Sequence, residues 1–92
     1  MKKMNKRSIE KALKIIDRLG TAADVSIYAI TECEAEAIVA NNESSRSFSV
    51  GSYWGMINTY CDLKLITVDE MFLLEDYRNY LVDKKVKELR AA

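Results

Sequence analysis

The chain has no histidine and no proline, only three glycines, and two cysteines, Cys33 and Cys61, that stand far apart. Histidine is the commonest general base near neutral pH and the usual nitrogen ligand of zinc, copper and iron, so its absence weakens the case for an enzyme or a transition-metal protein. Two isolated cysteines supply neither a structural zinc site nor a disulfide framework. We therefore expect no catalytic residues, no metal site and no cofactor, in a reduced, cytoplasmic protein.

Long apolar runs are also missing. No stretch approaches the roughly 18 apolar residues of a membrane span, and Lys14, Asp17 and Arg18 interrupt the first apolar segment, which excludes a signal peptide there. What is present is 92 residues, 49% hydrophobic and 30% charged, which is typical of one globular domain. We expect a single soluble domain over residues 1–92, with residues 1–7 a flexible basic tail.

Apolar residues recur at helical spacing in four segments. The first helix is predicted over Ile9–Leu19, capped by Ser8 and ended by Gly20. The other three are predicted over Ala22–Ala40, Phe48–Leu63 and Val68–Leu89. The polar segment 41–47 is expected to be the only sizeable loop. Short connections between amphipathic helices predict an all-α fold, a small antiparallel bundle of about four helices.

The second segment allows an alternative. Val25–Ile30 is short, apolar and partly β-branched, and Thr31 with Glu34 has the spacing of a capping box for a shorter helix. This alternative is an α+β fold with a single strand at 25–30. We favour the helix because a lone strand would leave its backbone groups without partners. The expected buried stripe of that helix is Ala23, Ile27, Ile30, Cys33, Ala37 and Ala40.

The segment 62–70, Asp-Leu-Lys-Leu-Ile-Thr-Val-Asp-Glu, predicts a turn between two helices. Thr67 and Glu70 have the spacing of a capping box for the last helix. The segment resembles a helix–turn–helix hairpin with an L-I-T-x-x-E turn that occurs in small bacterial and phage proteins of varied function. The resemblance implies a hairpin, and it suggests an accessory or inhibitory protein of a phage or mobile element.

Aromatic residues are concentrated in the second half of the chain, where seven of the eight lie between Phe48 and Tyr80. A bundle of this size cannot bury all of them, and exposed aromatic side chains are typical of protein interfaces. Two glycines spaced four apart on a helix would let a neighbouring helix approach closely. We predict a non-catalytic protein-interaction module that binds a larger protein or forms a homodimer. Its expected partner-binding residues are Gly51, Tyr53, Trp54, Gly55, Tyr60 and Tyr77.

Charge is balanced overall but unevenly spread. Residues 1–20 carry a net charge of +5 and residues 21–45 a net charge of −5, which favours either internal pairing or head-to-tail contact between copies. The alternative function is a nucleic-acid-binding regulator, because a basic stripe along the first helix can follow phosphates. The zero net charge of the chain argues against strong non-specific binding of nucleic acid. The stripe consists of Arg7, Lys11, Lys14 and Arg18.

Overall fold

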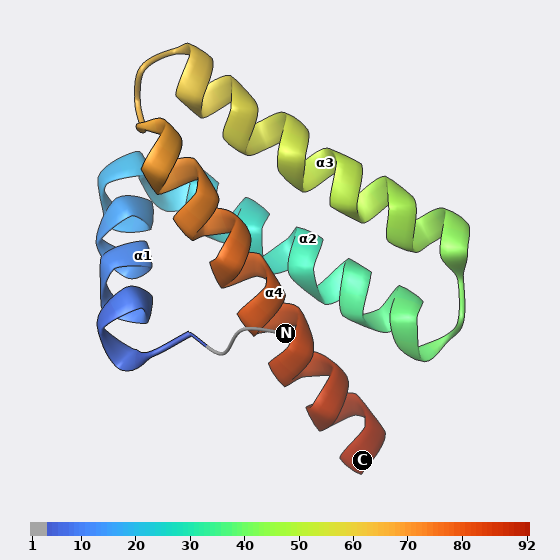
Figure 1. The fold of residues 1–92 in the computed structure, drawn as a ribbon. Helices are drawn as coiled ribbons and strands as arrows, with labels where there is room; N and C mark the ends of the chain where they lie inside the picture. Colours follow the sequence, from blue (N-terminus) through green and yellow to red (C-terminus); the bar gives the residue numbers. More distant parts are fainter. Residues whose placement is uncertain (1–3) are drawn as a thin grey trace.

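A computed structural model describes residues 4–92, which form four α-helices and no strand (Figure 1). The helices are α1 (Lys6–Leu19), α2 (Thr21–Val39), α3 (Glu43–Asp62) and α4 (Val68–Ala91). The all-α bundle is confirmed. The alternative strand at 25–30 is wrong, because those residues lie inside α2. Thr31 does not start a helix either; its hydroxyl donates to the carbonyls of Ile27 and Tyr28 one turn earlier.

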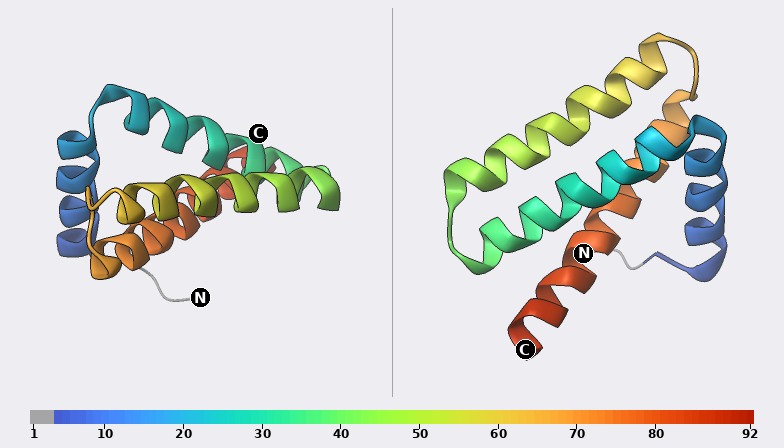
Figure 2. Two further views of the ribbon diagram at one scale, coloured as in Figure 1. Left: turned by 90° about the horizontal axis from the view of Figure 1, so that it is seen from above. Right: turned by 180° about the vertical axis from the view of Figure 1, so that it is seen from behind.

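Helix α2 lies at the centre of the bundle. It makes its most extensive contacts with α3 and α4, whereas α3 and α4 touch one another sparsely beyond the turn that joins them. Helix α1 is the shortest of the four, and it crosses one end of the other helices rather than lying along them (Figures 1 and 2). The end of α4 with the chain terminus projects away from α1. This arrangement places the α3–α4 turn beside α1.

The first helix begins earlier than the sequence predicts. The side chain of Asn5 accepts a hydrogen bond from the Ser8 backbone N–H at 2.8 Å, so Asn5 is the cap and Ser8 lies in the first turn. Lys6 and Arg7, expected in a flexible tail, are therefore helical, and residues 1–3 of that tail lie outside the described residues. Gly20 alone joins α1 to α2 at φ 106°, a backbone conformation that favours glycine.

The polar loop expected at 41–47 is also shorter than predicted. Helix α2 ends in a turn with Asn41 at φ 54°, and the Asn42 side chain then caps α3 by accepting from the Ser45 backbone N–H at 3.1 Å. The serine-rich segment that follows is helical because asparagine is as strong a cap as serine and comes first. Helix α3 consequently starts at Glu43 rather than Phe48.

The α3–α4 turn follows the sequence prediction closely. Lys64 adopts φ 61°, and the N–H of Leu65 donates to the Tyr60 carbonyl at 2.9 Å, which closes the end of α3 as a Schellman motif does. Thr67 and Glu70 form the predicted capping box: the Thr67 hydroxyl accepts from the Glu70 N–H, and the Glu70 carboxylate accepts from the Thr67 N–H. Both ends of the turn are thus fixed by hydrogen bonds.

The main core lies where α1, α2, α3 and α4 meet, and a second, smaller cluster continues between α2 and α4. The predicted stripe of α2 is only partly right. Cys33 and Ala40 are exposed, while Glu34 and Ala35 are buried, so the inward face of α2 is rotated from the one expected. The main core comprises Ala12, Ile15, Ile16, Ile27, Tyr53, Ile57, Ile66, Leu74 and Tyr77; the smaller cluster comprises Ala35, Val82 and Val86.

Candidate functional site

Two of the four aromatic anchors expected at a partner surface lie in the core instead. Tyr53 is fully buried and Tyr77 is 2% exposed, so neither side chain can contact a partner of the folded chain. They are buried because the aromatic stripe of α3 and α4 also provides the largest apolar surface available to the core. Trp54 and Tyr60 are half-buried and pack against the same core. The predicted aromatic surface is therefore reduced to the outer edges of these two rings.

The buried tyrosines are held by specific contacts. The Tyr53 hydroxyl donates to the Leu74 carbonyl at 2.5 Å, and burial raises the pKa of Tyr53 above its ordinary value of 10.0. Burial likewise raises the pKa of Tyr77, whose ring stacks on Tyr80 with 6.1 Å between centroids. Burial therefore opposes the deprotonation of both hydroxyls at alkaline pH.

Gly51 and Gly55 lie on the exposed face of α3. A Cβ atom added at either position would meet no other atom within 4 Å. Close packing against a neighbouring helix of the same chain, one form of the sequence prediction, is therefore wrong. Within residues 4–92, no other helix packs closely against these glycines, which face solvent.

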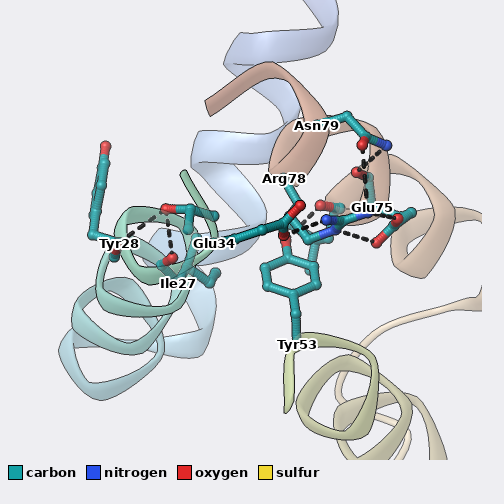
Figure 3. A network of polar contacts seen from close by, with 9 residues as sticks. Ile27, Tyr28, Glu34, Tyr53, Glu75, Arg78 and Asn79 are labelled. Carbon is teal, nitrogen blue, oxygen red and sulfur yellow. Dashed lines mark hydrogen bonds and ion pairs between the residues drawn. The ribbon is translucent and has the colours of Figure 1, made fainter. Parts of the chain in front are cut away.

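A buried ion cluster joins the three long helices. The Arg78 guanidinium of α4 donates to the Glu34 carboxylate of α2 and to both oxygens of Glu75, at 2.5 and 3.0 Å for the latter (Figure 3). The same guanidinium lies over the Tyr53 ring, 5.8 Å from its centroid. The side chains of Arg78, Glu34 and Glu75 are 7%, 4% and 14% exposed. Sequence patterns gave no sign of this cluster, because Glu34 and Arg78 are 44 residues apart.

The cluster is saturated by its own members. The hydrogen bonds to Glu75 and Glu34 raise the pKa of Arg78 despite its burial, and no buried side-chain nitrogen or oxygen in residues 4–92 lacks a hydrogen-bond partner. A hollow of about 490 Å³ opens beside Arg78 between α3 and α4, with Glu43 and Arg46 among its lining residues. One guanidinium faces two carboxylates, so the cluster has a net charge of −1, but all of its buried polar atoms already have hydrogen-bond partners. It has the properties of a structural element rather than of a ligand site.

Large apolar side chains are exposed together at the α3–α4 turn. We call this group, Leu63, Leu65, Val68 and Phe72, the hairpin patch; its members are 63%, 50%, 55% and 55% exposed. Val68 and Phe72 are four residues apart and so share one face of α4, outside the face that buries Leu74 and Tyr77. The sequence signal for this patch is that Val68 and Phe72 are apolar but lie outside the apolar face predicted for the last helix. The sequence prediction of partner-binding residues did not include these four positions.

The basic stripe of α1 lines a groove against the start of α4. This α1–α4 groove has a volume of about 450 Å³, and Lys11, Lys14 and Arg18 line its α1 side. Arg18 reaches across it to the Glu70 carboxylate at 2.9 Å and to the Leu65 carbonyl at 3.2 Å. The hydrogen bond from Arg18 holds the pKa of Glu70 below its ordinary value of 4.5. Arg7 is exposed on α1 but does not line this groove. The remaining lining residues are Ser8, Ile15, Asp69, Glu70 and Leu73.

The uneven charge of the sequence is not resolved by internal pairing between its first two segments. Within residues 4–92, the ion pair of the basic first segment is Arg18–Glu70, and that of the acidic second segment is Glu34–Arg78; both run to α4. Exposed charges of both segments therefore face solvent. Head-to-tail contact between copies stays a prediction.

No helix among residues 4–92 is long and apolar enough to cross a membrane. The same residues contain no grouping of three or more histidine, cysteine, aspartate or glutamate side chains suited to a metal ion. Comparison of the chain with protein families, with curated proteins and with solved structures found no match.

Proposed function

We propose that this chain is a non-catalytic protein-interaction module that docks on a larger protein through the hairpin patch. The observation that supports it is the exposure of Leu63, Leu65, Val68 and Phe72, each at least half accessible, within a ten-residue stretch. Grouped apolar side chains on the surface of a folded domain are typical of protein–protein contacts, because covering them yields about 25 cal/mol for each Å² removed from water.

The patch is also held in a fixed shape. The closing hydrogen bonds of α3, the capping box of α4 and the bond from Arg18 to the Leu65 carbonyl all converge on this turn. A surface that is ordered before binding loses little conformational entropy when a partner arrives, which favours affinity. The function proposed is the one expected from the sequence, but its anchors lie at the α3–α4 turn instead of at the aromatic residues of α3 and α4.

A matched pair of substitutions tests the proposal. Phe72 is the fifth residue of α4 and Val25 the fifth residue of α2, and both are more than half exposed. Phe72→Asp should reduce capture of the partner from the native host by about tenfold or more, as expected for a central apolar contact, whereas Val25→Asp should leave it unchanged. Binding is measured with the purified captured protein, and circular dichroism checks that both variants fold.

Loss of binding in Val25→Asp to the same extent, or full binding in Phe72→Asp, would contradict the proposal. Light scattering on the free chain separates the two forms of the module. If the free chain is a dimer and Phe72→Asp dissociates it, the partner is a second copy of the chain. A monomer leaves an unrelated protein as the partner.

The nucleic-acid alternative is less well supported. Lys11 and Lys14 are exposed, as it requires, but Arg18 is engaged by Glu70, and Asp69 lines the opposite side of the same groove. These carboxylates would repel a phosphate backbone that follows the stripe. Nucleic-acid binding predicts an affinity that falls steeply with salt, and an electrophoretic mobility shift at low salt tests it.

A further inference from the structure

The α1–α4 groove continues into the hairpin patch. A second hollow, of about 600 Å³, lies next to it and shares Arg18 and Glu70 with it. Leu65 and Val68 of the patch line this second hollow, together with Lys64. The two hollows thus form one surface that runs from the first turn of α1 to the α3–α4 turn.

This surface combines an apolar floor with basic edges. Ile15 and Leu73 supply apolar area in the α1–α4 groove, and Leu65 and Val68 supply it beside the turn. Lys11, Lys14 and Lys64 stand exposed along it, and within residues 4–92 none of them is in an ion pair. The carboxylates present are Glu70, which Arg18 neutralises, and Asp69. Within residues 4–92, three unpaired lysines thus stand against one unpaired carboxylate, so the surface has a net positive charge toward a partner.

We infer that this surface binds an amphipathic helix of the partner protein whose apolar side chains are flanked by carboxylates. The inference rests on the proposed function and names the chemistry of the segment that docks there. A helix laid in a groove contributes apolar side chains at every third or fourth position, which suits a floor made of separate apolar residues. Its carboxylates would meet Lys11, Lys14 and Lys64, an arrangement that speeds association and selects against basic segments.

The dimensions agree with such a segment. Helix α1 has 14 residues and is therefore about 21 Å long, so a helix of similar length can lie along it. A nucleic acid fits the surface less well, because the floor is apolar. Asp69 would repel phosphates and helix carboxylates alike, so the apolar floor is the feature that favours an amphipathic helix, whose apolar side chains it can bury.

The test uses two fluorescent 16-residue amphipathic peptides on the wild-type chain. One is built from leucine, alanine and glutamate, and the other has lysine at every glutamate position. We expect the acidic peptide to bind and the basic one to bind at least about tenfold more weakly, by fluorescence anisotropy at low salt. The double variant Lys11→Glu, Lys14→Glu should bind the acidic peptide about tenfold or more weakly than the wild type does. The matched control, Lys84→Glu with Lys85→Glu, changes charge equally at the far end of α4 and should have little effect.

Equal binding of the two peptides, or equal loss in the two double variants, would overturn the inference. Absence of binding by either peptide would also overturn it, as would displacement of the acidic peptide by a short DNA duplex at equal concentration. The proposed function is tested separately, by capture of the native partner. If Phe72→Asp abolishes capture of the native partner while Lys11→Glu, Lys14→Glu does not, the docking patch stands and the acidic helix is wrong. If Phe72→Asp leaves capture intact, the docking patch itself is wrong.

Discussion

Two arginines of this chain bind carboxylates in opposite surroundings, Arg78 with two partners and Arg18 with one. Arg78 is enclosed between α2 and α4, where its side chain and that of Glu34 are 7% and 4% exposed. Arg18 bridges α1 and α4 at the surface, where its side chain and that of Glu70 are 53% and 26% exposed. The chemistry is the same in both places, so burial decides the outcome. The first pair specifies how the long helices meet, while the second shapes a groove that a partner can reach.

Removal of one partner of the buried cluster should have the largest effect. Glu34→Ala would leave the Arg78 guanidinium paired with Glu75 but without its hydrogen bond to Glu34, and loss of a hydrogen bond to a charged group costs about 1.5–3 kcal/mol. We expect the free energy of unfolding, measured by urea denaturation, to fall by about that amount. Such a loss is a large share of the total stability of a small domain.

Arg46→Ala is the control for this prediction, because Arg46 is exposed beside the same hollow. It should change the free energy of unfolding by less than about 0.5 kcal/mol. A cost below about 1 kcal/mol for Glu34→Ala would mean that the buried cluster contributes little. Arg78 and Arg18 would then not differ in their contribution to stability, despite their different burial.

The hydroxyl of Tyr53, whose ring lies against Arg78, should contribute less than the charges. Tyr53→Phe removes the hydrogen bond to the Leu74 carbonyl without opening a cavity, and we expect a loss of about 1 kcal/mol. The wild-type protein should also lose stability as the pH rises above 10. The folded-state pKa of Tyr53 is raised, so the unfolded chain releases that proton first. Urea denaturation at pH 8 and above pH 10 measures both effects.

In Tyr53→Phe the alkaline loss should be smaller than in the wild type, although Tyr77, whose pKa is also raised, will retain part of it. Tyr80→Phe serves as the control, since Tyr80 is only half-buried. If Tyr80→Phe reduces the alkaline loss as much as Tyr53→Phe does, the buried hydroxyl is not its source.

The sequence predicted those parts of the molecule that depend on neighbours within one helical turn. The four helices and the Thr67–Glu70 capping box follow from spacings of three and four residues, and all are present. The start of α1 was wrong because Asn5 and Ser8 compete as caps, and the structure shows Asn5 capping the Ser8 N–H. The local sequence pattern cannot decide which of two favourable capping residues, three positions apart, begins the helix.

The candidate site was far less predictable than the fold. Arg18 and Glu70 are 52 residues apart, so nothing near either residue shows that the basic stripe faces acidic groups. Aromatic residues were expected at the surface because they are common in interfaces, but Tyr53 and Tyr77 fill the core of a domain that has little else of their size. Large exposed apolar side chains occur at several places, among them Phe48 and Val25, and the turn residues Leu63, Leu65, Val68 and Phe72 are the ones that follow closely in the sequence.

Glu70 belongs both to the capping box of α4 and to the surface ion pair with Arg18. Thr67→Ala removes the hydroxyl that accepts from the Glu70 N–H, and the loss of such a cap typically costs about 1 kcal/mol. We expect this decrease in the free energy of unfolding by thermal or urea denaturation. Thr67→Ser, which retains the hydroxyl, should restore most of it; equal destabilisation by both variants would show that the cap is not the cause.

The smallest effect is expected at the surface pair. Arg18→Ala should lower the free energy of unfolding by no more than about 1 kcal/mol, since both charges are solvated and the pair is screened by salt. The sharper readout is the carboxyl of Glu70. Its pKa lies below 4.5 mainly because of Arg18, with the Thr67 N–H as a second cause, so in Arg18→Ala it should rise toward 4.5 without reaching it. NMR titration of the side chain measures this.

The sign of the pH dependence follows from the same shift. A carboxyl with a lowered folded-state pKa stabilises the protein above its unfolded pKa, and that contribution disappears as the pH falls through the folded value. The wild type should therefore lose slightly more stability than Arg18→Ala between pH 6 and acid conditions. Were Arg18→Ala to cost as much as Glu34→Ala, exposure would not be what separates the two arginines. The α1–α4 groove would then have to be regarded as part of the framework of the fold rather than as a surface left open for a partner.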